Sequence, residues 1–186
     1  CVTAVLRAGA NACVLHYREN NAKSRDGELV LIDAGAEYRG YAADITRTFP
    51  VNGRFSKPQR ALHDLVCAAQ AAALALARPG IPYEAGHEAA VATLTEGLLS
   101  LGLLKGRLET AIERGDYKRY YRHKTGHWLG LDVHDVGEYR IDGESRLLEP
   151  GMVFTLEPGL YIPSDDTSVP AKWRGIGIRI EDDVLV

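Results

Sequence analysis

Short apolar runs separated by polar turns occur near the start of the chain, a pattern typical of β-strands. The first residues are strand-like, and residues 12–19 predict a further strand. Two more strands are expected at 28–35 and 41–51, joined by the polar segment 36–40. This part of the chain is therefore expected to form a sheet of neighbouring strands.

A helical block follows these strands. Ser56 is a suitable N-cap for a helix over residues 57–78, and Pro58 is tolerated in the first turn of such a helix. The alanine and leucine content favours helix, and Arg-Pro-Gly at 78–80 ends it. A second helix is expected over residues 83–101, ended by Gly102.

Strand patterns return in the last third of the chain, at 129–135, 152–158, 159–162 and 176–186. Strands, then helices, then strands again predict an α+β fold with an antiparallel sheet. At 186 residues the chain fits one domain spanning residues 1–186. The basic stretch 114–124 is interpreted as a solvated surface segment.

Composition excludes several classes of function. The net charge of −3 gives no general attraction to nucleic acid, and no apolar run approaches the ~18 residues that span a membrane. The scattered cysteines form neither a disulfide framework nor a paired zinc motif, which favours a reducing, cytoplasmic setting; they are Cys1, Cys13 and Cys67. Because the chain opens inside a strand-like segment, we expect it to be a fragment, with any targeting signal upstream.

Two aspartates come directly after apolar strand residues, at Asp33 and Asp44. If the two strands form a hairpin, its midpoint lies between Tyr38 and Arg39. This register predicts that the aspartates lie opposite each other, with Cβ atoms ~5 Å apart. Two carboxylates at that distance repel, so a positive charge is expected between them.

Two glutamates are placed in the same way by later strands. Side chains alternate along a strand, so Glu157 shares a face with Val153 and Thr155, and Glu181 shares one with Arg179. A single acid of this kind is usually a loop cap or a salt-bridge partner, with Arg39, Arg47 and Arg179 as candidate partners. Four acids in apolar strands are better explained by two divalent cations that neutralise them.

Histidines are concentrated in one stretch, at His123, His127 and His134. The stretch alone leaves open metal binding, proton transfer and a half-buried structural role. One imidazole added to the four acids gives five ligands, an oxygen-rich set that suits Mn²⁺, Fe²⁺ or Co²⁺. Two such ions ~3.5–4 Å apart lower the pKa of a bridging water and stabilise a tetrahedral transition state, which is the machinery of amide hydrolysis.

Four long motifs carry a family resemblance. They are "LIDAGAEYRGYAADITRTFPVNG", "GHWLGLDVHDVG", "LEPGMVFTLEPGLYI" and "RGIGIRIEDDVLV". Together they closely resemble the aminopeptidase P branch of the pita-bread metallopeptidases, in the same order and over almost the whole chain. The resemblance implies a curved antiparallel sheet covered by helices.

The resemblance also implies a dinuclear metal site with five ligands, namely Asp33, Asp44, His127, Glu157 and Glu181. By analogy Asp33 holds one ion, His127 and Glu157 hold the other, and Asp44 and Glu181 bridge the two. Mn²⁺ is the expected metal, with Co²⁺, Fe²⁺ and Zn²⁺ as alternatives.

Further residues are assigned by the same resemblance. His16, His123 and His134 are expected close to the substrate and the developing oxyanion, and Arg179 and Tyr161 beside the ligands. Glu157 is the candidate for moving a proton to the leaving nitrogen. For His16, a lone histidine, an ordinary structural role in a strand remains the alternative.

The expected function is a metal-dependent aminopeptidase that releases an N-terminal residue preceding proline. The resemblance implies homo-oligomers of a full-length protein with an additional N-terminal domain, which we expect to lie upstream of residue 1. The alternatives are a prolidase that cleaves Xaa-Pro dipeptides and a pita-bread binding module without activity. A methionine aminopeptidase fits less well, because the stretch around His123 does not resemble that branch.

Overall fold

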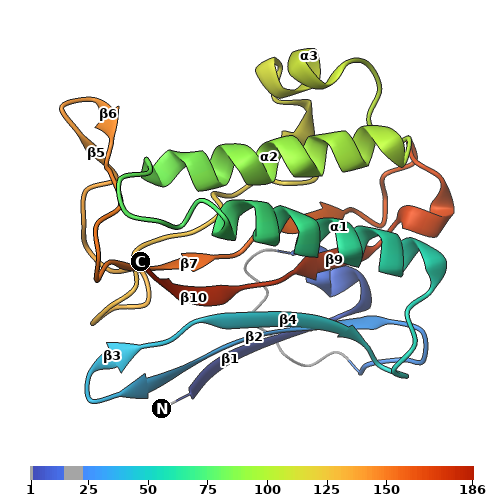
Figure 1. Ribbon diagram of the computed structural model, residues 1–186. Helices are drawn as coiled ribbons and strands as arrows, with labels where there is room; N and C mark the ends of the chain where they lie inside the picture. Colours follow the sequence, from blue (N-terminus) through green and yellow to red (C-terminus); the bar gives the residue numbers. More distant parts are fainter. Residues whose placement is uncertain (1, 15–22) are drawn as a thin grey trace.

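The computed structural model describes residues 2–14 and 23–186. Two long antiparallel helices, α1 (Lys57–Leu74) and α2 (Tyr83–Ser100), cover one face of a curved sheet (Figure 1). A short helix, α3 (Leu108–Glu113), follows them. The α+β class and the antiparallel sheet predicted from the sequence are confirmed, because every strand pair in the described residues is antiparallel.

The first part of the sheet is built around β2 (Leu29–Tyr38). This strand pairs on one side with β1 (Val2–Ala8) and on the other with β3 (Tyr41–Ala42) and β4 (Ile45–Pro50). Arg39 and Gly40 form the tight turn from β2 to β3, with φ angles of 54° and 87°. Positive φ at both turn positions matches the right-handed twist of the strands in a two-residue hairpin.

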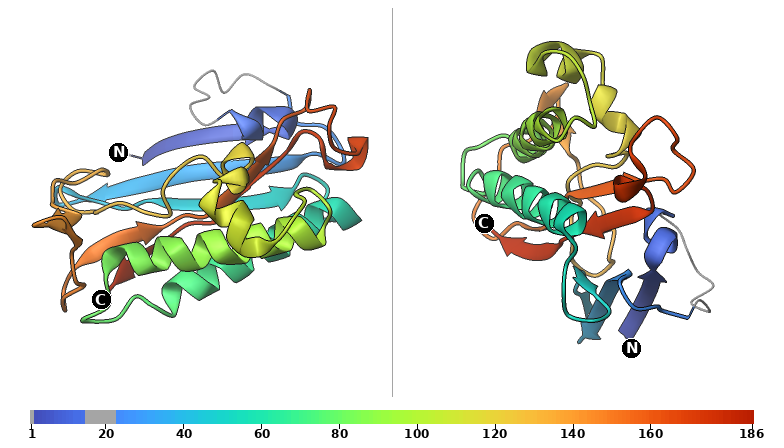
Figure 2. Two further views of the ribbon diagram at one scale, coloured as in Figure 1. Left: turned by 90° about the horizontal axis from the view of Figure 1, so that it is seen from above. Right: turned by 90° about the vertical axis from the view of Figure 1, so that its right-hand side faces the viewer.

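The second part of the sheet is one long hairpin made of four short strands. They are β7 (Val153–Leu156), β8 (Gly159–Ile162), β9 (Ile176–Arg179) and β10 (Asp182–Leu185). β7 pairs with β10 and β8 pairs with β9 in a single continuous register. A bridge between Thr46 and Glu181 joins this hairpin to β4, so the two parts form one curved layer (Figure 2).

The remaining elements are short. A hairpin of β5 (Arg140–Ile141) and β6 (Glu144–Ser145) lies beyond the N-terminal end of α2. Three 3₁₀ turns cover Gly9–Cys13, Asp116–Arg119 and Ala171–Trp173. No helix in the described part of the chain is long and apolar enough to cross a membrane.

The core lies between the helices and the sheet. One stripe of α1 is buried at helical spacing, through Leu62, Val66, Ala69 and Ala73. It packs with buried residues of α2 and of the hairpin, including Leu94, Leu98, Phe154, Leu156 and Ile178. Each fully buried leucine or isoleucine contributes roughly 1.5–3 kcal/mol to folding.

The two predicted helices are confirmed, with earlier ends. Ser56 and Gln59 form a capping box at the start of α1. The helix ends at Leu74 rather than at Arg78. Arg78 precedes Pro79, and a residue before proline avoids the helical conformation. The N–H of Gly80 then donates to the carbonyl of Leu148. α2 ends one residue early, at Ser100, and Gly102 has the positive φ of 73° expected after a helix.

One strand prediction, 129–135, was wrong, and another, 12–19, is contradicted in its first two residues. In the predicted strand 12–19, Ala12 and Cys13 belong to a 3₁₀ turn, and the rest, apart from Val14, lies outside the described residues. Residues 129–135 are irregular, because Gly130 donates to Asp132 and Asp135 donates to Trp128, which folds the chain back. The hydrogen-bonded edge lies just before it, at residues 125–129 beside β7.

Other predicted strands were interrupted. Segment 41–51 divides into β3 and β4 at Ala43–Asp44, and segment 176–186 divides into β9 and β10 at Ile180–Glu181. Segment 152–158 contains the shorter β7, and β8 matches 159–162.

Candidate metal centre

Asp44 lies where the first hairpin is interrupted. Between β3 and β4 the main chain of Ala43 passes directly over Gly35 in β2. A Cβ on Gly35 would lie 1.9 Å from the carbonyl oxygen of Ala43. Only glycine therefore allows this close approach. The strand is interrupted at Ala43 and Asp44, although the N–H of Ala43 still donates to the carbonyl of Ala36.

Glu157 and Glu181 lie where the second hairpin is interrupted. The register that pairs Leu156 with Asp182 and Gly159 with Arg179 places the two glutamates opposite each other. Glu181 is 2% exposed, and Glu157 is half-buried. Both interruptions thus leave acids facing one region of the sheet.

His127 reaches the same region from the edge of the sheet. Its carbonyl accepts a hydrogen bond from Thr155 in β7, and the neighbouring Thr125 carbonyl accepts one from Glu157. The imidazole Nδ1 lies 3.0 Å from the carbonyl oxygen of Trp128 and must donate to it. Nε2 is therefore left directed towards the acids, an arrangement common among metal-binding histidines.

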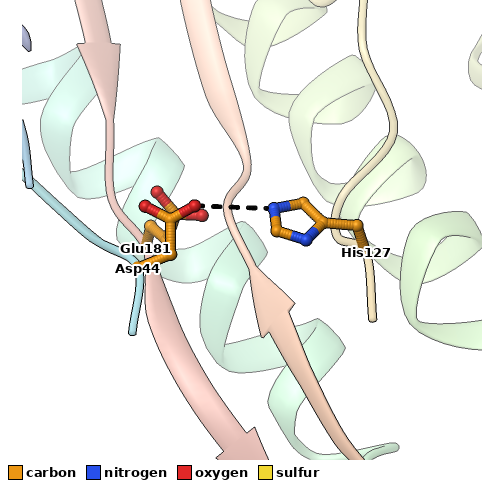
Figure 3. Close-up of side chains that lie close together, drawn as sticks. All are labelled: Asp44, His127 and Glu181. Carbon is orange, nitrogen blue, oxygen red and sulfur yellow. Dashed lines mark ion pairs between the residues drawn. The ribbon is translucent and has the colours of Figure 1, made fainter. Parts of the chain in front are cut away.

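These residues form a compact group of candidate ligands. One ligand atom from each of Asp44, His127 and Glu181 lies within 4.8 Å of the others (Figure 3). His127 Nε2 lies 3.6 Å from Asp44 Oδ2 and 3.8 Å from Glu157 Oε1. Four of the five predicted ligands are thus brought together.

The register predicted for the two aspartates was wrong. Asp33 is paired with Thr46, not with Asp44, because the turn is centred on Arg39 and Gly40. An even shift keeps side chains on their face, so Asp33 still faces the group. Its carboxylate forms an ion pair with Arg179.

Arg179 and Thr46 organise the acids, and both are buried. Arg179 Nε lies 3.9 Å from a carboxylate oxygen of Glu157 and of Glu181. It also donates to Thr46 Oγ1 at 3.1 Å, and Thr46 donates to Glu181 Oε2 at 2.5 Å. Sequence reasoning missed Thr46; the available signal was its place on the strand face of Asp44, two residues away.

His123 and Tyr161 form a pair beside Glu157. His123 Nδ1 donates to the carbonyl of Lys124, and Nε2 lies 2.8 Å from the hydroxyl of Tyr161. Tyr161 also accepts from Arg179 Nη1 at 3.3 Å. His123 Nδ1 lies 3.8 Å from Glu157 Oε2, so the predicted residues are adjacent to the acids.

His134 is exposed and packs edge-on against His127, with ring centroids 4.3 Å apart. No hydrogen bond within the described residues engages its nitrogens, which leaves them available to a ligand. The predicted residue His16 lies outside the described residues.

The sequence profile of metallopeptidase family M24 matches residues 1–186. The chain belongs to family M24. Similar proteins include Xaa-Pro aminopeptidases from Haemophilus influenzae, 53% identical, and Escherichia coli, 52% identical. Each comparison covers 98% of this chain but only 42% and 41% of the relative.

Solved structures give the same result. Pseudomonas aeruginosa aminopeptidase PepP matches with a TM-score of 0.97 and 57% identity, over 98% of this chain and 41% of that one. Proline aminopeptidase P II from Yersinia pestis matches with a TM-score of 0.94 and 53% identity, over 98% of this chain and 42% of that one. The predicted pita-bread fold is thereby confirmed. The chain spans about two fifths of the length of these relatives.

Three acids of this M24 site have raised pKa values. Burial and the neighbouring carboxylates raise the pKa of Glu181 to about 8. Burial also raises the pKa of Glu157 to about 7, against the opposing effect of Arg179 and His127. Burial raises the pKa of Asp33 as well.

The two histidines of this M24 site differ in charge. Burial opposes protonation of His127, but its contacts with Asp44 and the Trp128 carbonyl raise its pKa to about 9. Burial lowers the pKa of His123 to about 4, so His123 is neutral at pH 7. Because Nδ1 of neutral His123 donates, its Nε2 accepts from Tyr161.

The donor set fits divalent cations. Four carboxylates and one imidazole form an oxygen-rich set of ligands, and Arg179 is a permanent cation that forms ion pairs with Asp33, Glu157 and Glu181. A divalent cation bound by these acids would lower their raised pKa values.

Proposed function

We propose that this chain hydrolyses the peptide bond between an N-terminal residue and a following proline, using two divalent metal ions. The observation that carries the proposal is the grouping of Asp44, His127 and Glu181, with Glu157 3.8 Å from His127 and Asp33 on the same face. Asp33, Asp44, His127, Glu157 and Glu181 would hold the ions, with Mn²⁺ favoured over Co²⁺, Fe²⁺ and Zn²⁺.

The substrate class is supported by the relatives. The most similar curated proteins in the comparisons are named Xaa-Pro aminopeptidase, and 98% of this chain aligns with them at more than half identity. The motifs that carry the resemblance are the same segments that supply the candidate ligands. We therefore propose peptides with proline at the second position as substrates.

When bound, the two ions would activate a water and polarise the scissile carbonyl. The protein's own residues supply the remaining steps. Glu157 lies 3.8 Å from His127 Nε2 and 3.8 Å from His123 Nδ1, so its carboxylate is placed to carry a proton to the leaving proline nitrogen. His134, with its nitrogens available, donates to the oxyanion that develops on the carbonyl.

Two supporting contacts orient these groups. Arg179 holds Asp33 and, through Thr46, fixes Glu181. Tyr161 fixes the His123 ring, whose Nδ1 faces Glu157. His123 and Tyr161 thereby orient the proton-carrying carboxylate, and His16 completes the proposed set near the substrate.

The proposal extends to location and assembly. We propose a cytoplasmic, homo-oligomeric enzyme, by analogy with the resembled family. The net charge of −3 disfavours nucleic acid as a partner.

Cleavage assays with the metal-loaded protein test this function. The protein should release the first residue from Xaa-Pro-Xaa tripeptides, and the same tripeptide with alanine at position two is the matched control. Cleavage restricted to Xaa-Pro dipeptides would support a prolidase instead. Metal binding without hydrolysis of any of these peptides would support a binding module and overturn the proposal.

A further inference from the structure

The main-chain N–H of Asp44 has an unusual acceptor. On either side of the interruption the ladder is regular, with Glu37 paired with Ala42 and Ala34 paired with Ile45. Asp44 lies between these pairs, and its N–H donates to the carboxylate of Asp183, at 3.2 Å from both Oδ1 and Oδ2. The N–H of Ala43 still donates to the carbonyl of Ala36 in β2, so the next N–H, that of Asp44, faces away from β2, where the side chain of a residue 139 positions away accepts it.

Asp183 is held at a fixed position by β10. It is paired with Thr155 in β7, a fully buried residue whose hydroxyl lies 3.3 Å from the N–H of His127. Asp183 therefore connects the segment of Asp44 to the strand that supports His127. Asp44 and His127 both belong to the compact group of candidate ligands.

Asp183 lies beside the candidate ligands, where its carboxylate contacts the N–H of Asp44. The side chain shares the acidic region without belonging to the compact group of ligand atoms. Its direct contact is with the main chain that carries a ligand.

We propose that Asp183 is a positioning residue that holds the displaced main chain at Asp44, so that the Asp44 carboxylate points into the metal group. This inference rests on the proposed dinuclear function. Asp183 would then be a residue that hydrogen-bonds to the main chain of a ligand without binding the metal itself. Loss of such a partner typically weakens metal binding by about 10- to 100-fold.

Three substitutions separate positioning from simple charge attraction. Asp183→Ala removes the acceptor and the charge, Asp183→Asn keeps one acceptor oxygen without charge, and Asp183→Leu is a second acceptor-free variant of similar size. Asp182→Asn is the matched control, because it removes the same charge one residue away, where the side chain contacts Arg47 and Gln70.

Two readouts are needed, neither of which is activity. Calorimetric titration of the metal-free protein gives the affinity for Mn²⁺, and amide hydrogen exchange gives the protection of the Asp44 N–H. Asp183→Ala and Asp183→Leu should weaken one Mn²⁺ site by about 10- to 100-fold and should accelerate exchange at Asp44. Asp183→Asn and Asp182→Asn should stay close to wild type in both.

Contrary results are distinct. Equal losses in Asp183→Asn and Asp183→Ala would show a charge effect and overturn the positioning role. Wild-type affinity and Asp44 protection in a folded acceptor-free variant would overturn it as well. A wild-type protein that binds no Mn²⁺ would instead overturn the proposed function. If the wild-type protein binds two ions, a contrary result in the Asp183 variants overturns only the role proposed for Asp183.

Discussion

Glu157 and Glu181 lie opposite each other at the interruption of one long β-hairpin. Asp44 lies at the interruption of a second hairpin, and the bridge between Thr46 and Glu181 places the two interruptions side by side. In a regular sheet these acids would alternate with apolar neighbours along separate strands. The breaks in the ladders instead gather them around His127, and the predictions below follow from this arrangement.

Removing a bridging carboxylate should remove metal. Asp44→Asn or Glu181→Gln should lower the metal content and abolish hydrolysis, because a neutral amide bridges two cations poorly. Elemental analysis and the tripeptide assay measure both effects. Glu109→Gln, an exposed acid of α3, is the matched control. Normal stoichiometry with normal activity in Asp44→Asn or Glu181→Gln would remove that residue from the centre.

The two neighbouring histidines should behave differently. His127→Ala should lose metal, because its Nε2 is directed towards the acids. His134→Ala should retain metal and lose roughly 10²–10³-fold in kcat, as expected for a lost oxyanion donor. Metal content and kcat of the two variants, measured in parallel, test the assignment. An empty site in His134→Ala would show that the roles were assigned incorrectly.

Gly35→Ala should disturb the centre without touching a ligand. The added Cβ would lie 1.9 Å from the Ala43 carbonyl oxygen and would push the Asp44 segment away. We expect a loss of about 1–3 kcal/mol in the free energy of unfolding, with weaker metal binding.

Gly86→Ala is the control for this substitution. Gly86 lies inside α2, and an added Cβ would make ordinary contacts of 3.7 and 3.8 Å with Ala73 of α1. It should raise the free energy of unfolding by a few tenths to about 1 kcal/mol. Chemical denaturation measures both variants, and equal effects of the two substitutions would contradict the close approach at Gly35.

The metal-free protein should become less stable as the pH rises from 6.5 to 8. Glu181 has a pKa raised from 4.5 to about 8, so over this range the folded state holds protons that the unfolded chain has released. His127, raised from 6.5 to about 9, acts in the same direction. His123, whose pKa is lowered from 6.5 to about 4, acts in the opposite direction, chiefly below pH 6.5 and with little effect by pH 8.

The melting temperature in the presence of a chelator checks this pH dependence. It should fall from pH 6.5 to 8, and the fall should be smaller in Glu181→Gln, which has no proton to lose at this position. Added Mn²⁺ should restore more stability at pH 8 than at pH 6.5, because the ligands bind metal when deprotonated. A melting temperature that rises over this range in the metal-free protein is the contrary result.

Local patterns were sufficient to predict much of the fold. Strand alternation placed Glu157 and Glu181 on faces with Thr155 and Arg179, and the capping residue Ser56 located the start of α1. These features depend on neighbours within a few residues, so a single sequence reveals them.

The interruptions of the hairpins could not be predicted in this way. The break at Asp44 depends on contact between Ala43 and Gly35 and on a hydrogen bond to Asp183, 139 residues away. The contact between Thr46 and Glu181 joins residues 135 apart. Periodicity describes one strand at a time and carries no information on such contacts. The register of Asp33 was predicted wrongly for a local reason, because the turn is centred on Arg39 and Gly40 and not between Tyr38 and Arg39.

Diffraction from crystals of the Mn²⁺-loaded protein, recorded where manganese scatters anomalously, tests the central claim most directly. We expect two anomalous peaks ~3.5–4 Å apart, lying among the carboxylates and the Nε2 of His127, with Asp44 and Glu181 between the ions. A single peak, or two peaks away from the interruptions of the hairpins, would contradict the proposed dinuclear centre.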